Sequence, residues 1–228
     1  MIFWNRFILI LIISIISYLI GCINTSLAIT KILKIGSDIR SVGSGNAGFT
    51  NVLRTMGKKM AIFTFIGDFL KGILAVWITS MIVTSSQAFQ NNENLILSAK
   101  YISGMMCVIG HIYPCFFKFK GGKGVLTTWA TMFLIDWQIA VVLITVFLIT
   151  LWISKIVSLA SIMAAISYPV STFVICFFGD YLVTKNLYDM LFPTIASLIV
   201  GSLVLYKHKS NIARLLNGEE KKLSVHKK

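Results

Sequence analysis

Residues 7–22 read FILILIISIISYLIGC, and this apolar run sets the class of fold. A helix rises about 1.5 Å per residue, so about 20 consecutive apolar residues cross the hydrocarbon core of a bilayer. Of the 228 residues in the chain, 57% are hydrophobic and only 13% are charged. Soluble domains carry about 25% charged residues. The composition therefore predicts an integral membrane protein.

The same segment raises the question of a cleaved leader. It follows Arg6 in the manner of a signal peptide, and LIGC is similar to the lipid-attachment box of bacterial lipoproteins. However, the apolar pattern continues past Cys22 to Ile29, and further apolar runs follow along the chain. We therefore expect an uncleaved first span.

Later apolar runs predict about seven transmembrane helices in an all-α, polytopic protein. The expected spans lie near residues 6–30, 60–84, 97–117, 124–136, 137–154, 158–178 and 189–206. The fourth is short for a full crossing. The length predicts a single membrane domain over residues 1–228, without a separate soluble catalytic domain. Any active site must then lie on loops and helix ends.

The charge distribution predicts the orientation of the protein. The net charge is +13, with 21 Lys and Arg against 8 Asp and Glu. Only Arg6, Lys100 and Lys185 fall on or near the side of the N-terminus in a seven-span arrangement. Cytoplasmic loops of membrane proteins are rich in Lys and Arg. We therefore expect an outer N-terminus, a cytoplasmic C-terminus and a lipid bilayer as partner, with no nucleic acid. The expected cytoplasmic segments are 31–59, 118–123, 155–157 and 207–228.

The first polar stretch with chemical potential is DIRSVGSGNAGFTNVLR, residues 38–54. Its glycines allow a backbone to approach a ligand closely, and Arg54 offers a planar group suited to phosphate. The alternative is a connecting loop in which Asn and Gly only form turns. The neutral hydrogen-bonding candidates are Ser44, Gly45, Asn46, Thr50 and Asn51.

A second basic stretch, FFKFKGGKGV at residues 116–125, directly precedes an apolar helix. Backbone N–H groups at a helix N-terminus bind anions, so Lys118, Lys123, Gly121, Gly122 and Gly124 are candidate phosphate ligands. The lysines could instead extend to lipid headgroups. The nucleotide-binding pattern G-x-x-x-x-G-K-[ST] is absent from both stretches, which argues against an ATPase.

Three further groups of polar residues fall in or beside predicted spans. Asp68 and Lys71 are three residues apart, so they share a helix face, either as a functional pair with Lys71 binding phosphate or as a structural ion pair. Ser158 and Ser161 begin a span, where serines cap helices or bond across helix interfaces. In the tail, His208, Asn211, Arg214 and Leu215 recur at the spacing of one helix face.

The sequence predicts no metal site. The four cysteines (Cys22, Cys107, Cys115 and Cys176) are scattered through apolar segments and form no C-x-x-C pair. His111 lies four residues before Cys115, but Pro114 intervenes and no other ligand is nearby in the sequence. Buried, inert thiols are the expected state of these cysteines.

Taken together, these stretches resemble the PlsY family of bacterial acyl-phosphate:glycerol-3-phosphate acyltransferases. The resemblance covers nearly the whole chain and rests on five motifs in the family's order. These are GSGNAGFTNVLRTMGKK (43–59), DFLKG (68–72), GHIYPCFFKFKGGKGV (110–125), VSLASI (157–162) and HKSNIARLLNGEE (208–220). Small departures from the family pattern occur at Asn24, Phe49 and Leu126.

The resemblance implies transfer of a fatty acyl group from acyl phosphate to the sn-1 hydroxyl of glycerol 3-phosphate, giving lysophosphatidic acid for phospholipid biosynthesis. It also implies a multi-pass protein of the cell (inner) membrane that uses neither a metal cofactor nor acyl-coenzyme A. Residues that match family site positions are Ser44, Gly45, Arg54, Lys123, His208 and Asn211, with Ser158 and Ser161 near phosphate. We assign the catalytic roles to Ser44, Arg54, His208 and Asn211.

The residues also suit that chemistry on their own terms. Two phosphate-bearing substrates account for two basic, glycine-rich stretches, and an apolar acyl chain accounts for a site at the membrane surface. The acyltransferase pattern H-x-x-x-x-D is absent, since Phe116 lies five residues after His111 and Ala213 five after His208. We therefore expect direct attack by the glycerol hydroxyl. An organic-phosphate transporter and a lipid phosphatase are the alternatives, although no internal repeat supports the transporter.

Overall fold

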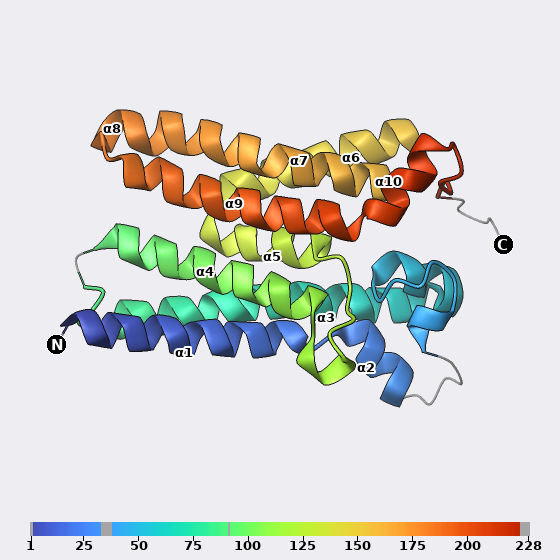
Figure 1. Ribbon diagram of the computed structural model, residues 1–228, viewed down its shortest axis with the longest axis horizontal. Coiled ribbons are helices and arrows are strands. Elements are labelled where there is room, and N and C mark those ends of the chain that lie inside the picture. The colour runs from blue at the N-terminus through green and yellow to red at the C-terminus, as the bar shows by residue number, and fades with distance from the viewer. Residues whose placement is uncertain (1, 33–37, 91, 224–228) are drawn as a thin grey trace. The chain divides into compact units, whose positions relative to one another are not determined.

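The computed structural model describes residues 2–32, 38–90 and 92–223, and in these ranges every regular element is a helix or a helical turn (Figure 1). Six of the helices are long and apolar enough to cross a membrane. This confirms the prediction of an all-helical membrane protein. By its contacts the chain divides into two compact units, Met1–Asp136 and Trp137–Lys228.

In the first unit, the long helices lie side by side. Its elements are α1 (Ile2–Cys22), α2 (Thr25–Ile32), the 3-10 turn η1 (Ile39–Ser41), α3 (Phe49–Ser85), α4 (Glu93–Ile112), the 3-10 turn η2 (Cys115–Phe117) and α5 (Val125–Ile135). Helix α1 packs on α4 and α3, and α5 packs on α3 and α4 (Figure 1).

Small residues permit the close approach of α1 and α4. A Cβ atom on Gly21 would collide with the Cys107 carbonyl, and one on Gly110 with the Tyr18 carbonyl. Such small-residue contacts are typical of packed membrane helices. The buried Ser103 hydroxyl also hydrogen-bonds Ser17 of α1 at 2.8 Å and donates to a carbonyl of α3 at 3.0 Å. Packing and polar contacts thus join the three helices.

The first apolar run is not one continuous helix. A span over 6–30 was predicted, but α1 ends at Cys22 and α2 begins at Thr25. Asn24 is fully buried in this break, and its Oδ1 accepts from the Leu27 N–H (3.1 Å) and the Ser26 hydroxyl (2.8 Å). An Asn that accepts these bonds acts as the N-cap of α2. Hydropathy cannot detect this break, because apolar residues flank it.

Helix α3 extends beyond the predicted span into the expected loop. It starts at Phe49, so residues 49–59 are helical, and its course is kinked at Gly57, where φ is +82°. Glycine tolerates this left-handed conformation, which other residues rarely adopt. The prediction of a loop over 31–59 was therefore wrong at its C-terminal end, while residues 33–37 of that loop lie outside the described residues.

The fourth predicted span, 124–136, corresponds to α5, which has only 11 residues and is not among the six long apolar helices. At about 1.5 Å per residue it is about 16 Å long. The seven-span count therefore remains a prediction.

The second unit is built on three long helices. Its elements are α6 (Trp137–Ser154), α7 (Val157–Cys176), the π-helical turn η3 (Phe177–Tyr181), α8 (Leu182–Thr184), α9 (Leu187–Lys207) and α10 (Lys209–Leu216). Helix α7 packs on both α6 and α9. A Cβ on Gly201 of α9 would lie 2.9 Å from the Ala165 carbonyl oxygen, so this contact also depends on glycine.

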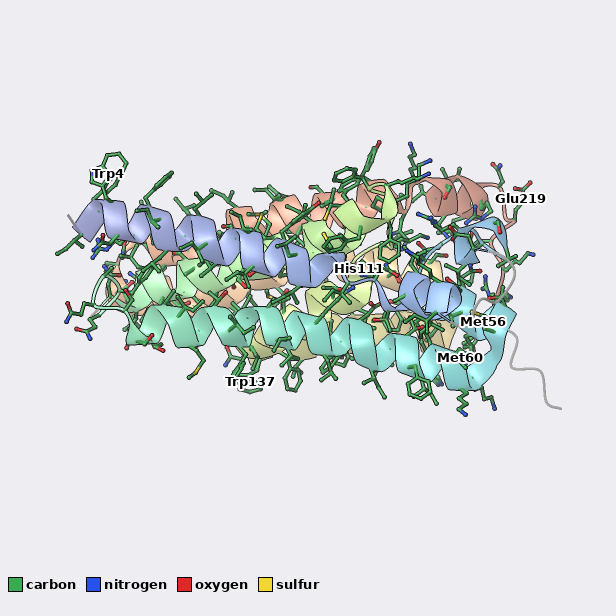
Figure 2. All side chains as sticks on the ribbon, turned by 90° about the horizontal axis from the view of Figure 1, so that it is seen from below. Trp4, Met56, Met60, His111, Trp137 and Glu219 are labelled. Atoms are coloured by element: carbon green, nitrogen blue, oxygen red, sulfur yellow. The ribbon has the colours of Figure 1, made fainter. Side chains whose placement is uncertain are left out.

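The N-terminus of α1 and the N-terminal part of α3 lie at opposite ends of the first unit. Figure 2 shows Trp4 of α1 at one end and Met56 and Met60 of α3 at the other. The loop before α3, residues 38–48, therefore lies at the end opposite Trp4. The orientation of these two ends relative to a membrane remains a prediction.

Candidate active site

The loop before α3 is shaped by one buried side chain, Asn51. Its amide group donates to the carbonyls of Ile39 (2.9 Å) and Val42 (3.0 Å). Its Oδ1 accepts the N–H of Ser44 (2.8 Å). Asn51 was predicted to bind phosphate, but both of its amide protons are used within the loop. Its role in the structure is to present Ser44.

The glycines of this loop adopt the conformations for which they were singled out. Gly43 and Gly45 have φ values of +62° and +70°, in the region that favours glycine. Ser44, between them, is exposed, whereas Asn46 and Thr50 are half-buried. The loop thus exposes the Ser44 hydroxyl between two glycines, which have no side chain to block a ligand.

Arg40 joins this loop to the second glycine-rich stretch. Its Nη1 donates to the carbonyls of Phe117 (3.0 Å) and Lys120 (2.9 Å). Its Nε and Nη2 bond Asp38 in a bidentate pair. Hydrogen bonds from Arg40 hold the pKa of the Asp38 carboxyl below its usual value. The two predicted phosphate-binding stretches of the first unit are therefore neighbours.

The basic side chains near these loops are in different settings. Arg54 is exposed on the first turns of α3, and no hydrogen bond or ion pair joins it to another described residue. Lys118 is also exposed, with a left-handed φ of +57°. Lys123 is half-buried. Of the predicted cations, Arg54 and Lys118 are thus the ones accessible from solvent.

The glycines before α5 do not all have the role that the sequence suggested. The Gly121 N–H donates to the Ile112 carbonyl, and the Gly122 N–H to the His111 carbonyl, both at 3.1 Å. These bonds satisfy carbonyls at the end of α4. The idea that both N–H groups bind a phosphate was therefore wrong. Gly124, with φ of +88°, does directly precede α5.

Lys71 lies in a buried polar cluster. Its ammonium group donates to Asp68 Oδ1 (2.8 Å), His111 Nδ1 (2.8 Å) and the Ile23 carbonyl (2.9 Å). All three ammonium protons have protein acceptors, so the geometry does not support the prediction that Lys71 binds a substrate phosphate. The predicted pairing of Asp68 with Lys71 is confirmed.

In the second unit, two predicted site residues converge on a carboxylate. Glu220 Oε1 accepts from the Ser158 hydroxyl (2.7 Å) and the Asn211 amide (2.8 Å), and its Oε2 accepts from Arg214 Nε (2.6 Å). Burial alone would raise the pKa of Glu220, but these hydrogen bonds outweigh burial and lower it. Asn211 and Arg214 therefore share one face of α10, as their spacing predicted.

The remaining predicted residues of this unit bond to nearby backbone. The Ser161 hydroxyl donates to the Val157 carbonyl of its own helix (2.9 Å). His208 is buried at the junction of α9 and α10, and its Nδ1 lies 2.8 Å from the Val204 carbonyl oxygen. Since a carbonyl can only accept, Nδ1 carries the proton.

Three residues that shape these loops and clusters had no assigned role from sequence. They are Arg40, Glu220 and Asn24, and each forms a hydrogen bond with a residue far along the chain. Arg40 donates to the Phe117 carbonyl, Glu220 accepts from the Ser158 hydroxyl, and Asn24 donates to the Ala47 carbonyl (3.5 Å). The nearby Asp38 could have pointed to Arg40 as part of a charge pair. Among the described residues, no three His, Cys, Asp or Glu side chains are placed to hold a metal ion.

Comparison with known proteins connects this geometry to a family. A family model described as "Glycerol-3-phosphate acyltransferase" matches residues 11–218, which include both glycine-rich stretches and the Glu220-binding residues of α7 and α10. The chain belongs to the glycerol-3-phosphate acyltransferase family.

Individual members of the glycerol-3-phosphate acyltransferase family match nearly full length. A member from Prochlorococcus marinus (strain MIT 9515) is 40% identical over 214 residues, covering 94% of this chain and 97% of the relative. A member from Clostridioides difficile (strain 630) is 36% identical over 217 residues, covering 95% and 97%. Both carry the same name, glycerol-3-phosphate acyltransferase.

Solved structures place the chain with PlsY within this family. A crystal structure of PlsY (YgiH), an integral membrane glycerol 3-phosphate acyltransferase, in its glycerol 3-phosphate form is 35% identical, with a TM-score of 0.75, covering 94% of this chain and 96% of that one. The lysophosphatidic acid form is 34% identical with a TM-score of 0.70, covering 94% and 95%. The family resemblance inferred from the sequence is confirmed.

Proposed function

We propose that this protein transfers a fatty acyl group from acyl phosphate to the sn-1 hydroxyl of glycerol 3-phosphate and so forms lysophosphatidic acid. One observation carries the proposal: the chain is similar over 94% of its length to PlsY structures in glycerol 3-phosphate and lysophosphatidic acid forms. These two ligands are the acceptor and the product of the proposed reaction.

In the first unit, we assign phosphate recognition to the adjacent loops that Arg40 joins. Arg54 is an exposed guanidinium with no partner among the described residues, and guanidinium groups bind phosphate oxygens in a bidentate manner. Lys118 and Lys123 add positive charge from the second loop, and Ser44 adds an exposed hydroxyl. Gly45 keeps the backbone beside Ser44 open to a ligand.

In the second unit, we assign Ser158, Ser161, His208 and Asn211 to substrate contact. The Nδ1–H of His208 donates to the Val204 carbonyl, and this bond fixes the orientation of the imidazole ring. Ser158 and Asn211 donate to the Glu220 carboxylate, an oxyanion with the same acceptor chemistry as a phosphate oxygen. These donors therefore have the chemistry that an anionic substrate requires.

The proposed reaction is direct transfer. The glycerol hydroxyl oxygen forms a bond to the acyl carbonyl carbon, the bond from that carbon to the phosphate oxygen breaks, and inorganic phosphate leaves. The hydroxyl proton passes to His208 or to a phosphate oxygen of a substrate. Acyl phosphate is already activated, so positioning and charge neutralisation supply the rate. Isolation of a covalent acyl-enzyme would contradict this route.

We further propose that the protein lies in the cell (inner) membrane with its active site on the cytoplasmic side, an outer N-terminus and seven spans. The basic bias of the predicted cytoplasmic segments supports this orientation. Labelling of single cysteines introduced at the Trp4 end and near residue 58, in intact and permeabilised cells, tests it. Equal access from outside at both ends would contradict it.

The function is tested with purified protein in detergent or lipid nanodiscs, given glycerol 3-phosphate and acyl phosphate. We expect lysophosphatidic acid and inorganic phosphate in equal amounts, and no product when acyl-coenzyme A replaces acyl phosphate. Phosphate release without acylated glycerol 3-phosphate would favour a phosphatase. Uptake of labelled glycerol 3-phosphate into vesicles without acylation would favour a transporter.

A further inference from the structure

A buried charged cluster in the first unit is formed by residues that are not assigned to substrate contact. Asp68, Lys71 and His111 have relative exposures of only 2%, 5% and 5%. Asp68 and Lys71 lie within the apolar α3, and His111 lies in the last turn of α4. Ionisable groups inside membrane helices are costly and are rarely kept without a role. The question is which part of the molecule this cluster serves.

The Lys71 ammonium group connects three segments of the chain. It bonds Asp68 on its own helix, His111 at the end of α4, and the Ile23 carbonyl in the break between α1 and α2. Figure 2 shows His111 near the end of α1. A carbonyl at a helix break has lost its helical partner and needs another donor. Lys71 supplies that donor.

Asp68 reinforces the same break from the other side. Its Oδ1 accepts from the Thr25 hydroxyl (3.2 Å) and the Thr25 N–H (3.4 Å), at the first residue of α2. The carboxylate is thus held between the first turn of α2 and the Lys71 ammonium group. The ion pair therefore fixes where α1 ends and where α2 begins.

His111 connects the cluster to the glycine-rich loop at residues 121–124. Its carbonyl accepts the Gly122 N–H at 3.1 Å, and the Ile112 carbonyl accepts the Gly121 N–H at 3.1 Å. A Cβ on Gly122 would collide with His111 Nε2, so the loop backbone rests directly against the imidazole. The ring therefore limits where residues 121–122 can lie, and Lys123 follows them immediately.

We propose that Asp68, Lys71 and His111 are positioning residues for acyl transfer: they hold the glycine-rich loop so that Lys123 meets the substrate phosphate. This inference rests on the proposed function. The group acts through the imidazole, whose Nδ1 accepts from Lys71 while its ring supports Gly122. A displacement of about 1 Å in a catalytic group can lower a rate about 100-fold.

A purely structural ion pair makes a different prediction. Removing one partner of a buried pair leaves an uncompensated charge and destabilises the fold, whereas replacing both partners is often tolerated. If the pair only stabilises the helices, the double variant Asp68→Asn/Lys71→Met recovers both stability and activity. If it positions the loop, the double variant recovers stability but remains slow, because His111 still lacks the Lys71 proton.

The experiment compares wild type, Lys71→Met, Asp68→Asn and the double variant in nanodiscs, by thermal unfolding and by kcat and KM for glycerol 3-phosphate. We expect the double variant to unfold near the wild-type temperature with kcat/KM about 100-fold lower. Wild-type kcat/KM in the double variant, or in a folded Lys71→Met, would overturn the inference.

A second pair of variants removes no buried charge and remains informative if the first set does not fold. In His111→Asn, the amide oxygen can accept the Lys71 proton from about the position of Nδ1, whereas His111→Leu has no acceptor. We expect His111→Leu to lose about 100-fold in kcat/KM and His111→Asn to lose clearly less, because Asn keeps the acceptor for Lys71 although it lacks the ring atoms beside Gly122. Equal, near-wild-type activity in the two variants would overturn the inference.

A matched control separates this effect from loss of any buried hydrogen bond. Ser103→Ala removes the buried contact between α1, α4 and α3 without touching the glycine-rich loop. We expect it to lower the unfolding temperature and leave kcat/KM unchanged. Failure of the proposed function itself is distinguishable, because wild-type protein would then form no lysophosphatidic acid at all.

Discussion

The two units arrange their proposed substrate-contacting residues in opposite ways. In the first unit, the side chains of Arg54 and Lys118 are exposed and form no hydrogen bond or ion pair with another described residue. Asn51 and Arg40 instead hold the loops in place through hydrogen bonds to backbone carbonyls. In the second unit, Ser158 and Asn211 are themselves bonded to Glu220.

This difference matters for interpreting variants. Where contact and support are assigned to different residues, a substitution can remove function and leave the fold intact. Where the same residues do both, stability and activity fall together. The comparison can be tested by substitutions in each unit.

The largest expected effect is that of Arg54→Ala. The side chain is exposed and forms no hydrogen bond or ion pair with another described residue, so the unfolding temperature should be unchanged, as for most surface substitutions. Loss of a charged group that stabilises a reacting anion costs about 100- to 1000-fold in rate. Acyl transfer by the purified variant measures this loss.

Lys58→Ala is the matched control for Arg54→Ala, since Lys58 is another exposed basic residue of α3. Its activity should equal that of wild type. Equal losses in the two variants would show that the general positive charge, rather than Arg54, attracts the substrates. Full activity in Arg54→Ala would remove this residue from the site.

Glu220→Ala should affect stability and activity together. The substitution leaves the Ser158, Asn211 and Arg214 donors without their shared acceptor. We expect the free energy of unfolding to fall by about 2 kcal/mol, the range for lost hydrogen bonds to a charged group. Thermal unfolding and acyl transfer, measured on the same sample, test the coupling. Loss of activity without loss of stability would break the contrast between the units.

Arg40→Ala should weaken substrate binding more than it weakens the fold. Without the guanidinium, the carbonyls of Phe117 and Lys120 lose their tie to the loop before α3. We expect KM for glycerol 3-phosphate to rise about tenfold, equivalent to about 1.4 kcal/mol. Arg40→Lys should rescue little, because one ammonium group cannot reproduce the planar fork. An unchanged KM would show that the loops are held together by other contacts.

The smallest expected effect is on the pH dependence of the second unit. The folded-state pKa of Glu220 lies below its ordinary value of 4.5, so its stabilising contribution is fully present above pH 4.5. That contribution is lost as the pH falls through the folded-state pKa. The difference in unfolding temperature between wild type and Glu220→Gln should therefore stay constant from about pH 8 to 5.5 and shrink only in more acidic solution. A difference that shrinks near neutral pH would contradict the assignment.

Local sequence predicted the long helices well. Helix α6 has the predicted bounds, residues 137–154, and α9 differs from its prediction by only two residues at the start and one at the end. Apolar length alone determines such elements in a membrane. The helical face of Asn211 and Arg214 was also predictable, because its spacing is a local property.

The errors share a physical cause, which is contact between residues far apart in the sequence. The break at Asn24 depends on Lys71, which bonds the Ile23 carbonyl from α3. The sequence predicts Gly121 and Gly122 as anion-binding residues, but in the structure their N–H groups donate to carbonyls at the end of α4. No local pattern specifies those partners.

The short helix α5 has a consequence for the surrounding lipid. It packs along α3 and α4, yet its length of about 16 Å is roughly half of a hydrocarbon core of about 30 Å (Figure 1). Such hydrophobic mismatch is relieved by local thinning of the bilayer or by polar residues drawn below the headgroups. Lys123 and Gly124 immediately precede this helix, so local thinning of the bilayer brings lipid headgroups toward them.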